Sequence, residues 1–315
     1  MTGAARTMPD ALRMLMTHLV DYAGLFPPAK LDMATTVANY DAYLRHADAW
    51  MLGRLIVPVA RLDEFEAAAA TLLPTDDDLE PWLISALTRP ADDDDGDALA
   101  ADLERIDAFN ERHAEAAGGL AGIDVIEVRA SSGRAIDGAL DAISDDLFPF
   151  FEIPVDADPR GLIATLAGSD AGAKIRTGGI TADLFPTPEQ VARFLAACAA
   201  AETPFKATAG LHHPLRHHST AVGTEMFGFL NVFVAATLAC IDSDRSASSL
   251  VPVLTETSIG AFAIDDAGIA WRDERLSVDD IESARERFAV SFGSCSFDDP
   301  REDLHALGFM PVPKP

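Results

Sequence analysis

The chain has 315 residues, of which 49% are hydrophobic, and a formal net charge of −27 at pH 7. Its length and apolar content are sufficient for one large buried core or two ordinary ones. The excess of acidic residues repels phosphate backbones and anionic lipid, which excludes nucleic acid and membrane surfaces from the expected partners.

Short apolar runs recur along the chain, with amphipathic helical segments between them. A helix is expected first, over 9–19, and the segment before D-Y-A-G-L-F-P-P at 21–28 is expected to form the first strand. Seven more strands are predicted from the runs at 55–59, 82–87, 125–128, 148–153, 173–177, 205–209 and 288–292. Most successive runs lie roughly 25–40 residues apart, which is typical of repeated βα units on a parallel sheet.

Eight such units favour a closed (β/α)8 TIM barrel, formed by residues 1–315 as one domain. No G-x-G-x-x-G follows the first strand and no G-x-x-x-x-G-K-[ST] occurs, so the open nucleotide-binding sheets lack support. An insertion is expected at about 242–276, with a β-hairpin at 261–271 that turns at 265–268. Helix starts are indicated by Thr187, Pro188 and Gln190, and by Ser277 with Asp280.

Cysteine usage and the start of the chain indicate the compartment. Cys198, Cys240 and Cys295 are widely spaced without a C-x-x-C pair, which predicts neither a disulfide framework nor a cysteine-rich zinc site. The first twenty residues lack an export signal, so a cytoplasmic protein is expected. The apolar segment 221–241 contains Glu225 and Asn231 and is predicted to be a buried helix rather than a membrane span.

Lysine occurs only four times, as Lys30, Lys174, Lys206 and Lys314. Lys174 and Lys206 lie in apolar, strand-like segments, where a lysine indicates chemistry or anion binding rather than solubility. Four successive strands carry charged or polar residues toward their carboxyl ends. These side chains must point inward, because helices cover the outer face of a barrel. They are Glu127 with Arg129, Glu152, Lys174 with Arg176, and Lys206 with Thr208. Active sites of barrels lie at the carboxyl ends of the strands, so this cluster predicts a site.

The loops after the two lysine strands carry further candidates. Gly178 and Gly179 follow the first of these strands. After the second, four of the eight histidines fall within seven residues, as His212, His213, His217 and His218. Neutral imidazole serves as a metal ligand and as an acid or base, although this spacing matches no standard zinc motif.

The last strand leads into a loop that suits an anion. Gly293, Ser294 and Ser296 offer backbone N–H groups and hydroxyls, and a short helix is expected from 299 to 307. Cys295, in the same loop, is expected to be a packed thiol, because the sequence identifies no base for it.

The segment K-A-T-A-G at 206–210 resembles the lysine strands of class I, Schiff-base-forming aldolases, especially the deoxyribose-phosphate aldolase group. The resemblance covers these five residues and the barrel plan. It implies that Lys206 forms the imine, that Lys174 is the neighbour that lowers its pKa, and that Glu152 relays protons. The chain departs from the pattern in the double histidine after the strand and in placing Lys206 on strand seven rather than six. E-V-R at 127–129 is similar to a strand of type I dehydroquinases, another imine-forming barrel family.

The expected function is that of a barrel lyase, aldolase or isomerase acting on a small anionic carbonyl compound, with or without a phosphate. Lys206 would attack the carbonyl, activated by desolvation and by the Lys174 cation. The substrate's charge would be held by Arg129, Arg176, Thr208, Gly178, Gly179 and the 293–296 loop. Glu152 or His212 would move protons, and no cofactor is required.

Two alternatives remain open at this point. In one, a divalent metal is held by His212, His213, Glu152 and Asp21, and the lysines stabilise an oxyanion. In the other, the barrel binds an anion without turning it over, because a fold alone does not specify a function. The apolar helix expected at 226–241 is compatible with a homo-oligomeric interface as well as with barrel packing.

Overall fold

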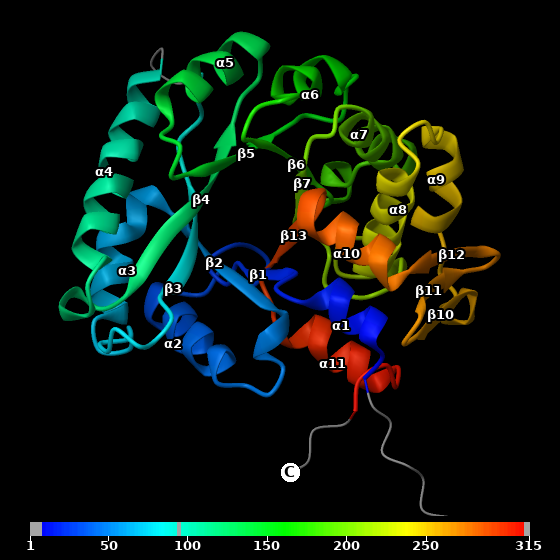
Figure 1. Cartoon of the computed structure of the whole chain (residues 1–315), viewed down its shortest axis with the longest axis horizontal. Helices are drawn as coiled ribbons and strands as arrows, with labels where there is room; N and C mark the ends of the chain where they lie inside the picture. The colour runs from blue at the N-terminus through cyan, green and yellow to red at the C-terminus, as the bar shows by residue number, and fades with distance from the viewer. Residues whose placement is uncertain (1–7, 93–95, 312–315) are drawn as a thin grey trace, which may run out of the picture.

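Eight parallel strands close into a barrel in the computed structural model, which describes residues 8–92 and 96–311 (Figure 1). The strands are β1 (Val20–Tyr22), β2 (Leu52–Pro58), β3 (Trp82–Leu87), β4 (Ala121–Arg129), β5 (Phe148–Glu152), β6 (Gly172–Arg176), β7 (Phe205–Thr208) and β13 (Ala289–Ser294). Their order around the barrel is β1-β13-β7-β6-β5-β4-β3-β2, so the first and last strands pair and leave no open edge. The predicted (β/α)8 barrel is confirmed.

Helices surround the barrel and connect its strands (Figure 1). They are α1 (Asp10–Met16), α2 (Met33–Leu44), α3 (Leu62–Ala69), α4 (Asp97–His113), α5 (Gly133–Ala142), α6 (Arg160–Leu166), α7 (Pro188–Ala200), α8 (Phe229–Ile241), α9 (Ala247–Leu254), α10 (Val278–Arg287) and α11 (Asp298–Ala306). The expected opening helix is α1, and the expected short helix after the last strand is α11. Because the helices cover the outside, the outward strand side chains are apolar and only the interior carries charge.

The predicted helix starts are present with their capping interactions. At α7, the Thr187 side chain accepts from the backbone N–H of Gln190, whose side chain accepts from the Thr187 N–H, and Pro188 occupies the first turn. Ser277 and Asp280 form the same reciprocal pair at α10. Each pair satisfies two backbone donors that a helix start otherwise leaves free.

The apolar segment 221–241 is only partly helical, which corrects the expectation. Helix α8 starts at Phe229, and residues 224–226 instead form a short strand. The helix is buried against the barrel, where Phe229 stacks on Phe292 with ring centres 5.6 Å apart and Phe233 stacks on Phe205 at 6.0 Å. Across the described residues, no helix combines the length and the apolar character needed to cross a membrane.

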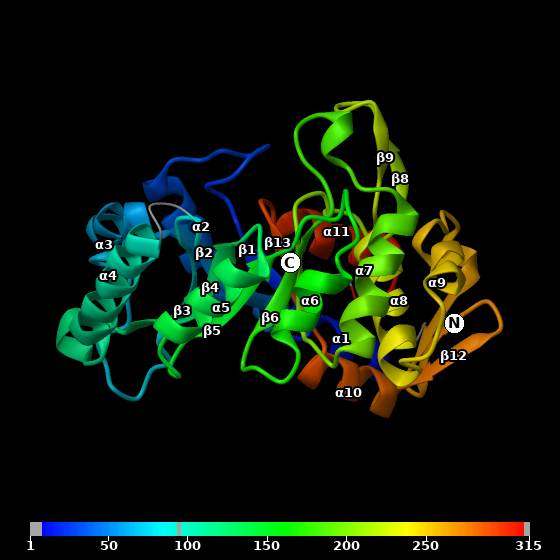
Figure 2. The same cartoon turned by 90° about the horizontal axis from the view of Figure 1, so that it is seen from above.

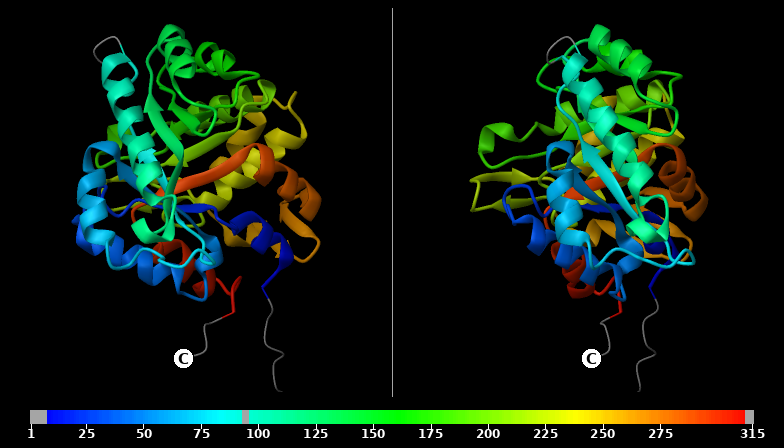
Figure 3. Two further views of the ribbon diagram at one scale, coloured as in Figure 1. Left: turned by 60° about the vertical axis from the view of Figure 1, so that its left-hand side comes forward. Right: turned by 90° about the vertical axis from the view of Figure 1, so that its left-hand side faces the viewer.

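Two small antiparallel sheets lie outside the barrel. The predicted hairpin before the last strand consists of β10 (Phe262–Asp265) and β11 (Gly268–Trp271), but a third strand, β12 (Glu274–Ser277), extends it. A second hairpin, β8 (His217–Ser219) and β9 (Thr224–Met226), occupies a segment expected to be a loop. It projects from one end of the barrel (Figures 2 and 3).

Candidate active site

Neighbouring barrel strands bring charged side chains to one level of the interior. Glu152 of β5 is in register with Lys174 of β6, which is in register with Lys206 of β7. Lys206 is in turn in register with Ser291 of β13. Residues in register on parallel strands point to the same face of the sheet, so these side chains meet inside the barrel.

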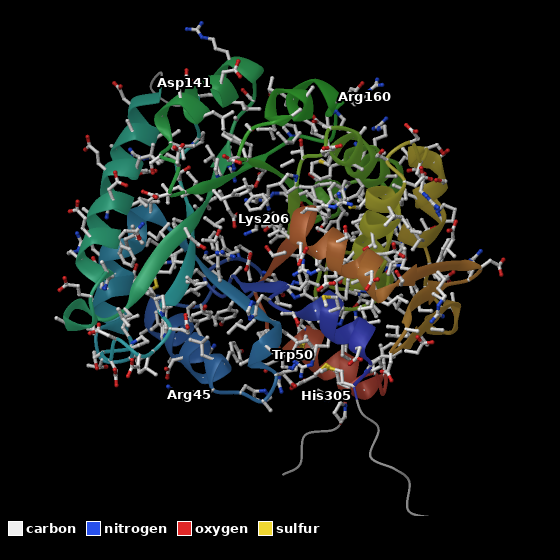
Figure 4. The ribbon with its side chains drawn as sticks, viewed as in Figure 1. Arg45, Trp50, Asp141, Arg160, Lys206 and His305 are labelled. Atoms are coloured by element: carbon white, nitrogen blue, oxygen red, sulfur yellow. The ribbon has the colours of Figure 1, made fainter. Side chains whose placement is uncertain are left out.

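Lys206 lies in the middle of the barrel between two carboxylates (Figure 4). Its Nζ donates to Asp21 Oδ2 at 2.8 Å and to Glu127 Oε1 at 2.6 Å, and its side chain is 1% exposed. Burial alone would lower the pKa of Lys206, but the charges of Asp21 and Glu127 outweigh burial and raise the pKa. Lys206 is therefore an ammonium at neutral pH.

Asp21, on β1, accepts hydrogen bonds from two further donors. Its Oδ2 also accepts from the Ser291 hydroxyl at 2.7 Å, and its Oδ1 accepts from the backbone N–H of Arg54 at 2.8 Å. The side chain is 1% exposed. A carboxylate with these donors holds the Lys206 ammonium in place.

Glu127, on β4, bridges the two lysines. One oxygen accepts from Lys206, and the other lies 2.6 Å from Lys174 Nζ. Burial alone would raise the pKa of Glu127, but the Lys174 and Lys206 charges outweigh burial and hold the pKa far below its usual range. The chain Asp21–Lys206–Glu127–Lys174–Glu152, called the floor cluster below, thus alternates in charge.

Lys174 is held less firmly than Lys206. Its Nζ is 2.9 Å from Glu152 Oε2, but Glu152 Oε2 is buried and makes no hydrogen bond within the described part of the chain. The pKa of Glu152 is nevertheless lowered, because the positive charges of Lys174 and Arg176 outweigh its burial. Glu152 Oε2 is thus a buried acceptor beside the Lys174 ammonium, and a bound substrate could donate a hydrogen bond to it.

A cavity of about 820 Å³ opens at the carboxyl ends of the strands, directly above the floor cluster. Its polar lining includes Glu127, Lys174, Glu152, Arg129, Arg176, Thr208, His212, His213, Cys295, Ser296 and Asp299. Its apolar lining includes Phe26, Ile56, Leu87, Ile180, Leu184 and Met226. Lys206 is not among the lining residues, so of the two buried lysines only Lys174 reaches the cavity.

Two arginines stand at the cavity rim. The side chains of Arg129 and Arg176 are 57% and 41% exposed, and each lies about 3.5 Å from Glu152 Oε1. Their guanidinium groups are thus oriented by the floor cluster but keep donors free for a ligand. This is the placement expected of groups that bind a carboxylate or phosphate.

The turn after β7 carries the histidines into the cavity wall. Ala209 and Gly210 both have positive φ, at 62° and 82°, which reverses the chain directly after Thr208. His212 then lies with Nδ1 3.3 Å from Asp299 Oδ2 and Nε2 3.9 Å from Cys295 Sγ. Burial alone would lower the pKa of His212, but the hydrogen bonds to Asp299 and Cys295 raise it to about 9.

The other histidines take separate partners. His213 Nδ1 lies 2.7 Å from Asp303 Oδ2, and the His213 and His217 rings meet at right angles with their centres 4.5 Å apart. His218 faces Glu225 across the β8–β9 hairpin at 3.1 Å. The hairpin therefore forms one wall of the cavity, to which Ser219, Ala221, Val222 and Met226 also contribute.

The small residues predicted to bind an anion are divided between cavity and packing positions. Gly179, Gly293 and Ser296 line the cavity. Gly178 packs against Phe185, whose ring lies 2.7 Å from the place where a Cβ would be. The Ser294 hydroxyl donates to the Ser296 carbonyl at 2.7 Å and contacts His212.

The four side chains of the metal alternative already have partners. Asp21 is engaged by Lys206, Glu152 by Lys174, His212 by Asp299 and His213 by Asp303. Within residues 8–92 and 96–311, no group of three or more histidine, cysteine or acidic side chains has the spacing of a metal site.

Several contributors to the site have no functional role in the sequence analysis, among them Glu127, Asp299 and Cys295. The alternation of Glu127 with Arg129 predicts that Glu127 faces the barrel interior. It does not predict the contacts of Glu127 with the two lysines. Asp299 was expected only to start a helix, and Cys295 only to pack. Both contact His212, which lies more than 80 residues earlier in the chain.

Comparisons with protein-family models, with curated proteins and with solved structures found no match for this chain.

Proposed function

We propose that the protein is a barrel lyase or aldolase whose Lys174 forms an imine with a small anionic carbonyl compound. One observation carries the proposal: the floor cluster alternates in charge through the barrel, and its only ammonium that reaches the cavity is that of Lys174. Buried charges are costly to maintain unless function retains them.

The proposal moves the attacking role from Lys206 to Lys174. Both lysines are paired with two carboxylates, but Lys206 lies below the cavity and its pKa is raised, so it is not the lysine proposed to attack a carbonyl. The positive charge of Lys206 acts instead on Lys174, through the Glu127 carboxylate that contacts both lysines. By engaging one oxygen of Glu127, Lys206 weakens the hold of that carboxylate on Lys174.

Glu152 is the proposed proton acceptor for Lys174, once an anionic substrate has neutralised the charge of Arg176 that helps to lower the pKa of Glu152. Its Oε2 lies 2.9 Å from Lys174 Nζ. The proton passes to Glu152, the amine attacks the carbonyl carbon, and the carbonyl oxygen takes a proton. Loss of that oxygen as water leaves the imine, and protonated imine nitrogen then serves as the electron sink for cleavage of the adjacent carbon–carbon bond.

The substrate is expected to be small and anionic. Arg129 and Arg176 supply the cationic contacts, and His212, a cation below about pH 9, adds a third on another wall. The apolar side chains of Phe26, Ile56 and Leu184 cover the rest of the cavity and limit the access of water.

Borohydride reduction tests the proposal. The protein is incubated with a pool of small keto acids, aldehydes and sugar phosphates, reduced, and mapped by peptide mass spectrometry. We expect a stable adduct on Lys174 that is absent from Lys174→Arg, which keeps the positive charge but forms no imine. Lys30→Arg, at an exposed lysine, is the matched control. An adduct on Lys206 would assign the reaction to the other lysine, and no adduct with any compound would contradict the proposal.

The same cations also suit a barrel that binds an anion without turnover. That alternative is favoured by the pairing of both buried lysines with carboxylates. It predicts that an anion is retained tightly, that no adduct forms, and that Lys174→Arg binds the anion as the unmodified protein does. Isothermal calorimetry with inorganic phosphate and with pyruvate distinguishes this outcome from imine chemistry.

A further inference from the structure

A second group of reactive side chains lies on another wall of the cavity. Cys295, His212 and Asp299 all line it, and they come from the loops after β13 and β7 and from the first turn of α11. Cys295 Sγ is 3.9 Å from His212 Nε2, and His212 Nδ1 is 3.3 Å from Asp299 Oδ2. A thiol, an imidazole and a carboxylate thus stand in series, which is the geometry of an activated nucleophile.

Ser294 fixes which imidazole nitrogen carries the proton. The Ser294 hydroxyl donates to the carbonyl of Ser296 at 2.7 Å, so its oxygen acts as an acceptor toward His212 Nδ1 at 3.4 Å. Asp299 Oδ2 is a second acceptor at the same nitrogen. Nδ1 therefore holds a proton, and in the cationic imidazole the second proton lies on Nε2 and points at Cys295 Sγ.

The geometry around His212 favours a thiolate at Cys295. Once Nε2 is protonated, the imidazolium faces Sγ and is itself balanced by Asp299 on its other side. A cation beside the sulfur favours the thiolate, which is the reactive form of cysteine. Cys295 is also open to the cavity, so a small molecule can reach it.

We propose that Cys295 is a nucleophile that adds reversibly to the carbonyl carbon of a small aldehyde bound in the cavity. The thiolate sulfur, paired with the His212 imidazolium, forms a bond to the carbonyl carbon, the π electrons move to the oxygen, and the proton on His212 Nε2 passes to that oxygen, which leaves a neutral imidazole. The product is a thiohemiacetal. No oxidant, reductant or leaving group is needed, and Lys174 takes no part in the step.

The other two cysteines provide internal references. Cys198 is fully buried on α7, and burial raises its pKa well above its usual value. Cys240, near the end of α8, is half-buried, and burial also raises its pKa. Neither is expected to react quickly at pH 7, so modification at Cys295 can be read against both in one peptide map.

Alkylation rates test the activation of Cys295. The protein is treated with iodoacetamide at pH 7, and modification of each cysteine is followed by peptide mass spectrometry beside glutathione at equal concentration. We expect Cys295 to react about tenfold faster than glutathione, and His212→Gln to bring it to the glutathione rate. Asp299→Asn, which removes no packing volume, should slow it severalfold. A Cys295 rate equal to or below that of glutathione, or one unchanged in both variants, would overturn the proposal.

Protection from alkylation tests the addition to an aldehyde. Glyoxylate should slow alkylation of Cys295 and leave Cys240 unaffected, whereas glycolate, a similar anion without the aldehyde, should protect neither. Equal protection by the two anions would mean that they only occupy the cavity, which contradicts covalent addition. Borohydride reduction of the same sample, followed by peptide mapping, reports separately whether glyoxylate forms an imine on Lys174. Protection of Cys295 and an adduct on Lys174 are thus two independent readouts, and each proposal can fail without the other.

Discussion

The floor cluster and the rim arginines carry charge in different ways. In the floor cluster, the Lys206, Asp21 and Glu127 side chains are only 1–2% exposed, and each has an oppositely charged partner fixed by the strands. At the rim, the Arg129 and Arg176 side chains are 57% and 41% exposed and contact Glu152 loosely. Water screens the rim charges and not those of the floor cluster. Changes to the floor cluster should therefore cost stability, and changes to the rim should cost ligand binding.

The largest effect is expected at Lys206. Lys206→Met leaves two buried carboxylates without their cation, and breaking a buried pair in this way costs about 3–5 kcal/mol of unfolding free energy. Urea unfolding followed by circular dichroism measures the loss. Lys30→Met makes the same substitution at an exposed lysine and should change stability by about 0.5 kcal/mol or less. Equal effects of the two substitutions would break the distinction between floor cluster and surface.

A smaller effect is expected on the acid sensitivity of the fold. The pKa of Glu127 is lowered in the folded state, so the unfolded chain takes up a proton first as the pH falls. The stability that Glu127 supplies is complete above about pH 5 and is lost below it, by about 2–3 kcal/mol. Glu127→Gln should therefore lose less stability than the unmodified protein between pH 6 and pH 3, as urea unfolding at each pH would show. Equal losses of unfolding free energy in the two proteins would mean that Glu127 does not determine the loss of stability at low pH.

The rim is expected to affect binding alone. Arg176→Gln should weaken the binding of glyoxylate about tenfold, which corresponds to about 1.4 kcal/mol, because one charge-assisted contact is lost. Its unfolding free energy should stay within about 0.5 kcal/mol of the unmodified value. Calorimetry and urea unfolding measure the two quantities, and Arg134→Gln, at an exposed arginine of α5, is the control. A large loss of stability in Arg176→Gln would place this arginine with the floor cluster.

The smallest effect is expected at His212, which lies between the two extremes of burial. Its pKa is raised to about 9, so its charge stabilises the fold below pH 6.5 and that contribution fades as the pH rises through about 9. Asp299 is 45% exposed and partly screened, so Asp299→Asn should lower the pKa of His212 by roughly half a unit. Nuclear magnetic resonance titration of the imidazole measures the shift. An unchanged midpoint would leave Cys295 as the main cause of the raised pKa.

Much of the floor cluster follows from sequence periodicity. Runs such as Trp82–Leu87 and Phe148–Glu152 are continuous and apolar because their strands are buried on both faces, so they are visible without a structure. On two other strands, β4 and β6, the alternation of Glu127 with Arg129 and of Lys174 with Arg176 shows which face of the strand points inward. The barrel and its inward charges could be predicted for this reason.

Periodicity could not assign roles to the two lysines. Lys174 and Lys206 lie at the same level of adjacent strands, so alternation treats them alike. What separates them is Asp21, which is brought to Lys206 by closure of the barrel between β1 and β13. The resemblance to class I aldolases favours Lys206 as the imine-forming residue. The burial of Lys206 and its contacts with Asp21 and Glu127 favour Lys174 instead in the present proposal.

The rim depends on contacts that no local pattern encodes. Strands β8 and β9 contain one apolar residue between them, Met226, so no local apolar pattern marks the β8–β9 hairpin at the end of the barrel. The approach of Cys295 to His212 requires both the tight turn at Ala209 and Gly210 and the pairing of β13 with β7. Such arrangements arise from long-range packing and are visible only once the barrel is closed.

Closure of the barrel by its last strand also dictates when the interior charges lose water. Asp21 meets Lys206 across 185 residues of chain, and the Ser291 hydroxyl that completes this contact comes from a strand 270 residues after Asp21. These side chains therefore can meet only when β1, β7 and β13 lie together. Loss of water from the charges and their pairing are thus expected to accompany closure of the barrel, which avoids the cost of burying one of these charges alone.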